Sequence, residues 1–482
     1  MNHTELFHAL SPEAALIGGG LLALALDLTL GRKKVPEARW HAAVRIGLLA
    51  LGLAACFTYA AGASGPAFGG ALLLDPLARA ARFAVLLLAG LSLALLPGTT
   101  RLRQPAEFVA VVLFATAGFT VMAVAQNLLL AFLALELASL ALYILAGFDK
   151  GRPESAEAGL KYFLFGGVSA AFLLFGFSLI YGLTGSIEIP QIARQIGAAP
   201  WSPLLVVALV MVLAAFGFKA AAAPFHLWAP DVYEGAPAPA AALIASASKV
   251  AGFTLFARLL WSGAGDATGQ APSWMLALAV LAGASLLLGN LVALAQANLR
   301  RLLAYSAIAH AGVMLLGVIT GGRFGAGALI YYTFTYGLAT IGAFGVIAVV
   351  ERAGRCDTIT DLAGLHRRSP LLAGCLAVFV LSLAGIPPLA GFFGKFLLFS
   401  QALRFAGLSN PAGWLALLAI ALSAVALYYY LIVLKQAFVA APATGSAGGI
   451  RTPRKPAAAL LVAAGLLVGL GLFPSVVLRL IS

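Results

Sequence analysis

Long apolar runs, separated by short polar segments, recur along almost the whole chain. Most runs are about 20 residues long, which is enough for a helix to cross a bilayer core of roughly 30 Å. They are too long and too continuous for the strands of a membrane barrel. A helix also satisfies its own backbone hydrogen bonds within lipid. The pattern therefore predicts an all-α polytopic membrane protein with about fourteen transmembrane helices.

The predicted spans are separated by short polar segments. We place them near residues 11–30, 42–62, 72–96, 106–126, 127–147, 159–183, 203–223, 236–262, 273–296, 301–320, 325–350, 370–403, 411–440 and 457–480.

Two of these spans contain helix breakers at membrane depth. The seventh breaks in "GFKAAAAPFHLWAPDVYEGAP" (217–237) and the twelfth in "AGIPPLAGFFGKF" (384–396). Proline removes a backbone donor and disfavours helix at the preceding residue. Irregular backbone at this depth is tolerated where it is buried in protein or lines a wet cavity. Paired breaks in two halves of a chain favour an inverted repeat around a central ion site.

The two breaks suggest a division of the chain into two five-helix units with flanking helices. An odd number of helices per unit requires consecutive units to be inverted. The correspondence is not position by position, because Lys219 precedes its proline whereas Lys395 follows Pro387 and Pro388. We predict helices one to three in 1–104, the first unit in 105–262, the second in 273–440 and the last helix in 456–482.

The basic residues indicate how the chain is oriented. Only 10% of the residues are charged, against roughly 25% in soluble domains. The net charge of +13 would suit nucleic acid, but the positive residues gather in alternate loops, which is the positive-inside pattern. It predicts that both termini lie outside the cytoplasm. The basic side contains Arg32, Lys33, Lys34, Arg39, Arg101, Arg103, Lys150, Arg152, Arg300, Arg301, Arg352, Arg355, Arg367, Arg368, Arg451, Arg454 and Lys455.

A small set of ionisable residues remains inside the apolar spans. Each central charge costs about 2.5–3.5 kcal/mol to insert, so such residues usually mark an ion or proton path. Glu136, Lys219, Lys249 and Lys395 lie deepest. The full set is Glu136, Lys161, Lys219, Lys249, His310 and Lys395.

Some of these residues also have structural interpretations. Lys161 lies near a helix end and either joins the path or extends its ammonium to the interface. His310 either relays protons or is a neutral imidazole bonded to a neighbouring helix. Lys435 and Arg258 lie nearer span ends, and we expect both to extend towards the interface.

Lysine next to a helix break suits proton transfer. Burial disfavours the charged form of lysine, whereas a nearby carboxylate favours it. Movement of Glu136 towards or away from Lys219 would therefore change the protonation of the lysine. A half-helix ending near Ala222 would direct its negative end at this cation. His226 would help hold water there, whereas Asp231 and Glu234 are better explained as loop and cap residues.

Motifs for other chemistry are missing from the sequence. Cys56, Cys356 and Cys375 have no metal-binding spacing, and there is no CxxC cluster for an iron–sulfur centre. There is no strand-flanked GxGxxG and no Walker motif. The glycine-rich segment 321–327 is a turn between two spans.

Four segments resemble the subunit N type of the antiporter-like membrane subunits of bacterial NADH–quinone oxidoreductase, respiratory complex I. Subunits L and M and the large subunits of cation/proton antiporters belong to the same wider class. The resemblance covers most of the chain, and "PFHLWAPDVYEGAP" and the lysine at 395 favour the N type. The segments are "LALELASLALYIL" (133–145), "FKAAAAPFHLWAPDVYEGAPAP" (218–239), "LLAYSAIAHAG" (302–312) and "GIPPLAGFFGKF" (385–396).

The resemblance implies one proton channel in the membrane arm of a translocase in the inner membrane. Glu136 and Lys219 would form the pair on helices five and seven, Lys249 the central relay, His310 a bridge and Lys395 the exit residue, with Lys161 in the entry half. It implies no cofactor in this chain, with FMN and iron–sulfur clusters in other subunits. The implied partners are subunits M and K and the helical arm of L, with quinone and NAD handled by the rest of the complex and no nucleic acid bound.

Two other functions use the same features. A subunit of a multisubunit cation/proton antiporter would contain the same buried lysines. In a purely structural membrane subunit, the buried charges would only fix helix packing. Four deep charges and two broken helices favour transport over the structural role.

Overall fold

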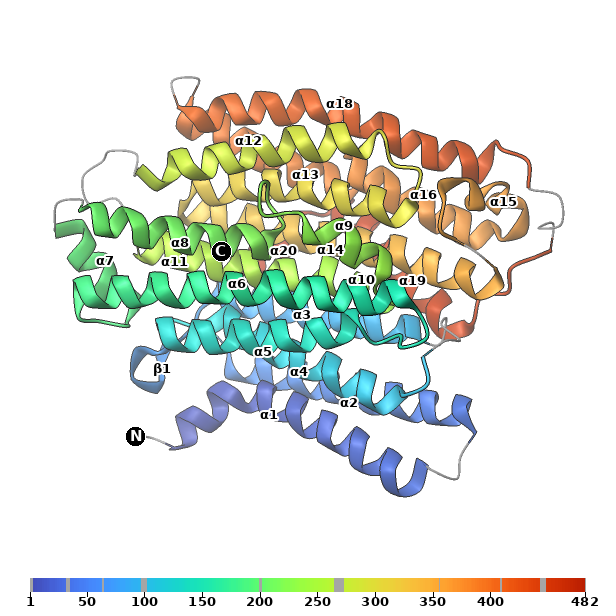
Figure 1. Cartoon of the computed structure of the whole chain (residues 1–482), viewed down its shortest axis with the longest axis horizontal. Helices are drawn as coiled ribbons and strands as arrows, with labels where there is room; N and C mark the ends of the chain where they lie inside the picture. Colours follow the sequence, from blue (N-terminus) through green and yellow to red (C-terminus); the bar gives the residue numbers. More distant parts are fainter. Residues whose placement is uncertain are drawn as a thin grey trace.

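A computed structural model describes residues 3–31, 35–62, 65–96, 102–198, 202–263, 273–354, 356–407, 410–442 and 448–481. The chain is a bundle of long, roughly parallel helices (Figure 1). Thirteen helices in the described residues are long and apolar enough to cross a membrane. The broken pair α16 and α17 covers the remaining predicted span. The predicted polytopic all-α fold is therefore confirmed.

The first half of the chain begins with three spans and a short hairpin. Several helices here start with proline, whose fixed φ suits the first helical turn. Its elements are α1 (His3–Leu26), the π-helical turn η1 (Asp27–Gly31), α2 (Pro36–Ala61), β1 (Gly65–Ala67), the 3₁₀ turn η2 (Phe68–Gly70), β2 (Leu72–Leu74), α3 (Pro76–Leu95), α4 (Pro105–Val124), α5 (Leu128–Ala146), α6 (Pro153–Thr184), α7 (Ile189–Ala198), α8 (Pro203–Ala220), α9 (Trp228–Gly235), α10 (Ala238–Ala245) and α11 (Ala247–Gly263).

The second half repeats the alternation of long spans and short caps. Its elements are α12 (Ser273–Ala293), α13 (Leu299–Thr320), α14 (Gly322–Ala353), the 3₁₀ turn η4 (Ile359–Leu362), α15 (Leu365–Arg368), α16 (Pro370–Ala384), α17 (Ala390–Gln401), the π-helical turn η5 (Ala402–Ala406), α18 (Pro411–Phe438), α19 (Arg454–Leu472) and α20 (Ser475–Ile481).

The structure departs from the predicted spans at four places. The antiparallel pair β1/β2 precedes α3, where a longer helix was predicted. The amphipathic α7 lies in the predicted loop after α6. The eighth span is divided into α10 and α11 at Ser246, whose hydroxyl bonds back to the carbonyl of Ala242 at 2.6 Å. The last span ends at Leu472, and α20 follows beyond Pro474, which has no backbone donor to continue the helix.

Helix α14 is the centre of the bundle. It packs against α3, α10, α11, α13, α16, α17 and α19. In its apolar 18-residue stretch, 94% of the residues are buried, compared with 28% in that of α6 and 33% in that of α18. The core therefore lies around α14, and the apolar faces of α6 and α18 point outward.

Two isolated antiparallel β-bridges each join the residue before a helix to a loop. One joins Asn127, which precedes α5, to Glu188, which follows α6. The other joins Asn298, which precedes α13, to Thr358, which follows α14. In each bridge, the flanking residues exchange two backbone hydrogen bonds. The N···O distances of these four bonds range from 2.8 to 3.2 Å. Each asparagine side chain also caps its helix by accepting from two backbone N–H groups.

Candidate functional site

The break after α8 is held by side chains from neighbouring elements. Helix α8 ends with Ala221 in the left-handed conformation, at φ 56°. A helix end leaves backbone groups without partners in the helix, and side chains bond to two such groups here. Trp228 Nε1 donates to the carbonyl of Phe218 at 3.0 Å, and the hydroxyl of Ser285 accepts from the N–H of Ala223 at 2.9 Å. The break is thus stabilised by side chains that bond to two of its buried backbone groups.

Lys219 lies in the last turn of α8 and is 6% exposed. Its Nζ donates to Ser139 Oγ at 3.3 Å. Ser139 is three residues after Glu136 on α5, so both side chains lie on one helix face. No ion pair joins Glu136 to Lys219 in the described structure, although the two charges interact electrostatically. Glu136 Oε1 is buried and has no hydrogen-bond partner in the part of the chain that the structure describes.

Lys249 connects the first break to the second half of the chain. It is 3% exposed, and its Nζ donates to the carbonyls of Ala220 at 3.0 Å and Ala307 at 2.9 Å. Ala220 is the last residue of α8, whereas Ala307 lies on α13. The cation at the negative end of α8 is therefore Lys249, where the sequence predicted Lys219.

His310 lies in the core of the second half, 4% exposed. Its Nδ1 is 2.6 Å from the hydroxyl of Tyr332, and its Nε2 is 3.2 Å from that of Tyr430. The ring of Tyr336 packs 4.9 Å from the imidazole, centroid to centroid. The Lys249 ammonium lies 5.7 Å from the centre of the same tyrosine ring. The ring of Tyr336 therefore lies next to both Lys249 and His310.

Lys395 lies on α17 just after the second break and is 7% exposed. Its Nζ donates to the carbonyl of Ala384, the last residue of α16, at 3.0 Å. Gly385 ends α16 in the left-handed conformation at φ 88°. The negative end of α16 therefore receives a lysine ammonium, as the end of α8 does.

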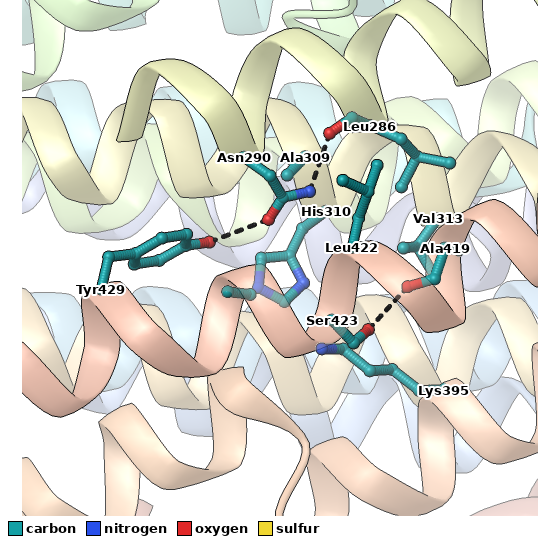
Figure 2. Close-up of a pocket in the computed structure, with 11 residues that line it drawn as sticks. Leu286, Asn290, Ala309, His310, Val313, Lys395, Ala419, Leu422, Ser423 and Tyr429 are labelled. Atoms are coloured by element: carbon teal, nitrogen blue, oxygen red, sulfur yellow. Dashed lines mark hydrogen bonds between the residues drawn. The ribbon is translucent and has the colours of Figure 1, made fainter. Parts of the chain in front are cut away.

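Two small cavities connect these groups in pairs. One of about 10 Å³ is lined by Lys219 and Lys249 together with Phe216, Phe253 and Phe256 and two small residues. The other, of about 20 Å³, is lined by both His310 and Lys395 (Figure 2). A cavity needs roughly 10–15 Å³ to hold one water. The second cavity therefore has room for a water between the imidazole and the lysine.

Figure 2 shows the polar groups that surround the larger cavity. Asn290 Nδ2 donates to the carbonyl of Leu286 at 2.8 Å, and its Oδ1 accepts from the hydroxyl of Tyr429 at 3.3 Å. Ser423 donates to the carbonyl of Ala419 at 2.8 Å. The cavity lining contains no carboxylate.

Lys161 does not belong to the buried row formed by Lys219, Lys249, His310 and Lys395. Its side chain is 37% exposed and pairs with Glu157 at 2.5 Å and Asp231 at 2.6 Å. Asp231 also pairs with Arg301 at 2.8 Å, and Glu234 pairs with the same arginine. Burial alone would raise the pKa of Asp231, but hydrogen bonds from Lys161 and Arg301 outweigh it and lower the pKa. Asp231 and Glu234 therefore join α6 and α9 to the start of α13.

Two ion pairs that involve a buried arginine were not recognised from the sequence. Arg258, expected to reach the interface, is instead 3% exposed, pairs with Asp75 and donates to the carbonyl of Ala123. Arg82 pairs with Glu13 at 2.6 Å inside the first helices. The sequence did contain a signal for both pairs, because each places an arginine and an acidic residue in separate apolar spans. By contrast, Lys435 is exposed.

Several hydrogen-bonding or packing neighbours of these buried residues were also missed. They are Ser139, Asn290, Tyr332, Tyr336 and Tyr430. Ser139 follows Glu136 at helical spacing, and "YYTFTY" (331–336) places hydroxyls four residues apart on one face. His226 is 6% exposed, and its Nδ1 is buried without a partner among the described residues. No group of three or more His, Cys, Asp or Glu positioned for a metal occurs within the described ranges.

A bundle with broken helices, each closed by a buried lysine, defines the class of antiporter-like membrane subunits. The chain belongs to the family described as NADH:quinone oxidoreductase/Mrp antiporter, whose model matches residues 125–427. It is 47% identical to "NADH-quinone oxidoreductase subunit N 2" of Acidobacterium capsulatum, over 99% of each chain. These findings confirm the resemblance inferred from the four sequence segments.

Solved structures agree with this assignment. A chain of respiratory complex I from Thermus thermophilus with bound aureothin is 36% identical and superposes with a TM-score of 0.80, over 97% of this chain and 98% of that one. A chain of the Mrp complex from Dietzia also has a TM-score of 0.80, over 98% and 96%. Its identity is only 23%, so this second likeness concerns the fold alone.

Proposed function

We propose that the chain is a proton-translocating membrane-arm subunit of NADH–quinone oxidoreductase. The observation that carries the proposal is the buried row of Lys219, Lys249, His310 and Lys395, each less than 10% exposed in an apolar bundle. Such groups are costly to bury and are expected where protons cross. NADH oxidation and quinone reduction would take place in other subunits.

The residues have distinct roles in this proposal. Glu136 sets the charge state of Lys219, because a nearby carboxylate favours the ammonium form. Lys219 and Lys249 exchange a proton across the cavity that they share. Lys249 passes it towards His310, and His310 and Lys395 exchange it across the larger cavity. Lys161, partly exposed and ion-paired, fits an entry position at the bundle surface better than a place in the row.

The alternative is a subunit of a cation/proton antiporter. The family description covers both groups. The relative at 47% identity over 99% of the chain favours the oxidoreductase. We accordingly place the chain beside the M and K subunits and the helical arm of L, in the inner membrane. We assign it no redox cofactor of its own and leave FMN and iron–sulfur clusters to other subunits.

We further propose that residues 105–262 and 273–440 form two inverted five-helix units between 1–104 and 456–482. Three similarities support this division. In both units the first helix packs against the second and the fifth, and the third packs against the fourth. The bridges at Asn127 and Asn298 have the same hydrogen-bond pattern and the same position between the second helix and the loop after the third. Both units have a broken fourth helix.

The orientation in the membrane follows from the basic residues. Arg352, Arg367, Arg368, Arg451 and Arg454 all lie at or just beyond the same end of the spans in this topology. We propose that this side is cytoplasmic and that both termini lie outside. Arg32, Lys33, Lys34, Arg101 and Arg355, which contribute to the same pattern, lie outside the described residues.

The test uses two substitutions of Lys219 in the assembled complex. Lys219→Arg keeps the charge but cannot release a proton at working pH, because guanidinium stays protonated. Lys219→Ala removes the cation altogether. We expect both variants to assemble and to lose about 100-fold or more in proton pumping, the scale of lost proton-transfer catalysis. NADH–quinone turnover should fall with it where the two processes are tightly coupled.

Assembly, electron transfer and proton pumping are measured in parallel on the same preparations. Lys435→Arg, a substitution at an exposed position of α18, is the matched control and should leave all three unchanged. Assembled Lys219→Arg complexes that pump at the unmodified rate would refute the relay role of this lysine.

A further inference from the structure

A large cavity lies where the ends of four segments meet, and it shares no lining residue with the buried row of Lys219, Lys249, His310 and Lys395. It has a volume of about 870 Å³ and is formed by the start of α2, the segment before α4, the end of α14 and the segment before α19. Pockets that bind small ligands measure roughly 300–1,000 Å³. In the topology proposed above, all four ends face the cytoplasm. Nothing in the proton path uses this cavity.

Positive charge dominates the cavity lining. Arg39, Arg103, Arg352 and Arg451 line it, and Glu37 is the only carboxylate among the lining residues. Arg39 is already paired with Asp27. Arg103 and Arg451, by contrast, are exposed and have no ion pair among the described residues. Two guanidinium groups are thus available to an anionic ligand, and guanidinium binds phosphate in a bidentate manner.

The surface beside the cavity identifies the kind of anion. His41 lines the cavity, and Arg45, Leu49 and Leu53 follow it at four-residue spacing on one face of α2. Leu49 is 74% and Leu53 is 48% exposed. This face changes from basic to apolar as it descends from the helix end. Trp40, also in the lining, is a residue type enriched at membrane–water interfaces.

We propose that this cavity binds the headgroup of an anionic phospholipid, with Arg103 and Arg451 on its phosphate and the acyl chains along the Leu49–Leu53 face of α2. Basic pockets between transmembrane helices on the cytoplasmic side are known to suit such headgroups. A free phosphate would use the arginines but not the apolar face. A zwitterionic lipid would use the apolar face but gain less from the unpaired charges.

The experiment uses the whole complex in nanodiscs of phosphatidylcholine containing a minor fraction of photoactivatable phosphatidylglycerol. After illumination, mass spectrometry measures the lipid attached to the peptides that contain Trp40 and Arg103. The test variant is Arg103→Gln combined with Arg451→Gln. The matched control is Arg454→Gln, an exposed arginine three residues from Arg451 that does not line the cavity.

Each arginine lost should weaken labelling about fivefold, the equivalent of ~1 kcal/mol per basic residue at an anionic membrane surface. The double variant should therefore lose about 25-fold, and Arg454→Gln should match the unmodified complex. Arg103→Lys with Arg451→Lys keeps the charge and should retain most of the labelling. Inorganic phosphate, compared with chloride at equal ionic strength, should not compete.

Three results would overturn the proposal. Equal labelling of the double variant and the control would show that the arginines do not select the lipid. Competition by inorganic phosphate would identify a soluble anion as the ligand. Attachment of a neighbouring subunit in place of lipid, when a photo-crosslinking residue replaces the uncharged lining residue Thr452, would show that an acidic protein segment fills the cavity.

Discussion

The two helix breaks are closed by the same contact but by differently placed lysines. At the first, the carbonyl of Ala220 accepts from Lys249, which comes from α11. At the second, the carbonyl of Ala384 accepts from Lys395, which comes from α17 within the same broken span. A half-helix ends with unpaired carbonyls and a partial negative charge, so a cation stabilises either end. The geometry requires an ammonium at the carbonyl, not a lysine at a fixed distance from proline.

This comparison explains why Lys219 and Lys395 do not correspond in sequence. At the contact itself, the counterpart of Lys395 is Lys249. Lys219 is an additional lysine, and it lies with Ser139 in the electrostatic field of Glu136. The buried groups near the first break therefore include two lysines and a carboxylate. Those near the second break include one lysine, an imidazole and tyrosine hydroxyls, around a cavity with no carboxylate among its described lining residues.

The difference suggests a division of labour between the halves. A lysine near a carboxylate has a charge state that responds to movement of the carboxylate. A lysine beside neutral hydrogen-bonding groups lacks that control and is better suited to passing on a proton. The first half would then be the switch and the second half the conduit, with Lys249 between them.

The largest expected effect is at Lys249. Lys249→Met removes the donor from the carbonyls of Ala220 and Ala307 and breaks the only lysine contact between the break and α13 among the described residues. Proton pumping of the assembled complex should fall about 100-fold or more. Lys249→Arg can keep both hydrogen bonds but not the proton exchange, so it should also fail to pump.

Pumping is measured in vesicles with equal amounts of assembled complex, and Lys435→Met at an exposed site serves as the control. Normal pumping by Lys249→Arg would mean that this lysine only caps α8. The two breaks would then share a structural contact and no proton chemistry.

The sequence was sufficient for the features that depend on local composition. Most of the spans were predicted from their apolar runs. The two proline breaks and the buried charges at Lys219, Lys249 and Lys395 were predicted because each interrupts an apolar run. The break at Ser246 was not, since a serine in a helix commonly bonds back to the preceding turn without ending it. The hairpin β1/β2 has too few residues for a periodic signal.

Contacts between distant segments could not be read from one sequence. Lys249 and Ala220 are separated by 29 positions, and Arg82 and Glu13 by 69. Their pairing depends on how the helices pack around α14. Tyr332 and Tyr430 likewise have the composition of ordinary core residues, and only the folded chain brings both hydroxyls to His310.

An intermediate effect is expected at Tyr430, which belongs to the proposed conduit. Tyr430→Phe removes the hydroxyl that contacts both His310 and Ser306 and keeps the ring in place. A buried group left without its partner costs about 1–3 kcal/mol, so pumping should fall about tenfold. Tyr428→Phe, two residues away and 62% exposed, is the matched control. Equal pumping by the two variants would remove Tyr430 from the path.

The smallest expected effect compares the residues that end the two half-helices. Ala221 and Gly385 both lie in the left-handed region, at φ 56° and 88°. This conformation costs an L-residue roughly 1–2 kcal/mol but is freely available to glycine. Gly385→Ala should therefore destabilise the second break, and its Cβ would also lie 3.0 Å from Lys395 Cδ. Ala221→Gly should relieve the first break, offset by about 0.5–1 kcal/mol of extra chain entropy in the unfolded state.

The two substitutions thus have opposite expected signs at equivalent positions. Thermal inactivation of the assembled complex should come earlier for Gly385→Ala and stay unchanged or come slightly later for Ala221→Gly. Gly374→Ala, within α16 where an added Cβ meets nothing within 4 Å, controls for a glycine substitution in the same span. If Gly385→Ala matched this control, the left-handed end would not be what fixes the position of the Ala384 carbonyl. The contact between Lys395 and the Ala384 carbonyl would then have to be held by packing of α17 alone. The two breaks would share the contact between a lysine and a carbonyl, but the backbone conformation would position that carbonyl only at the first.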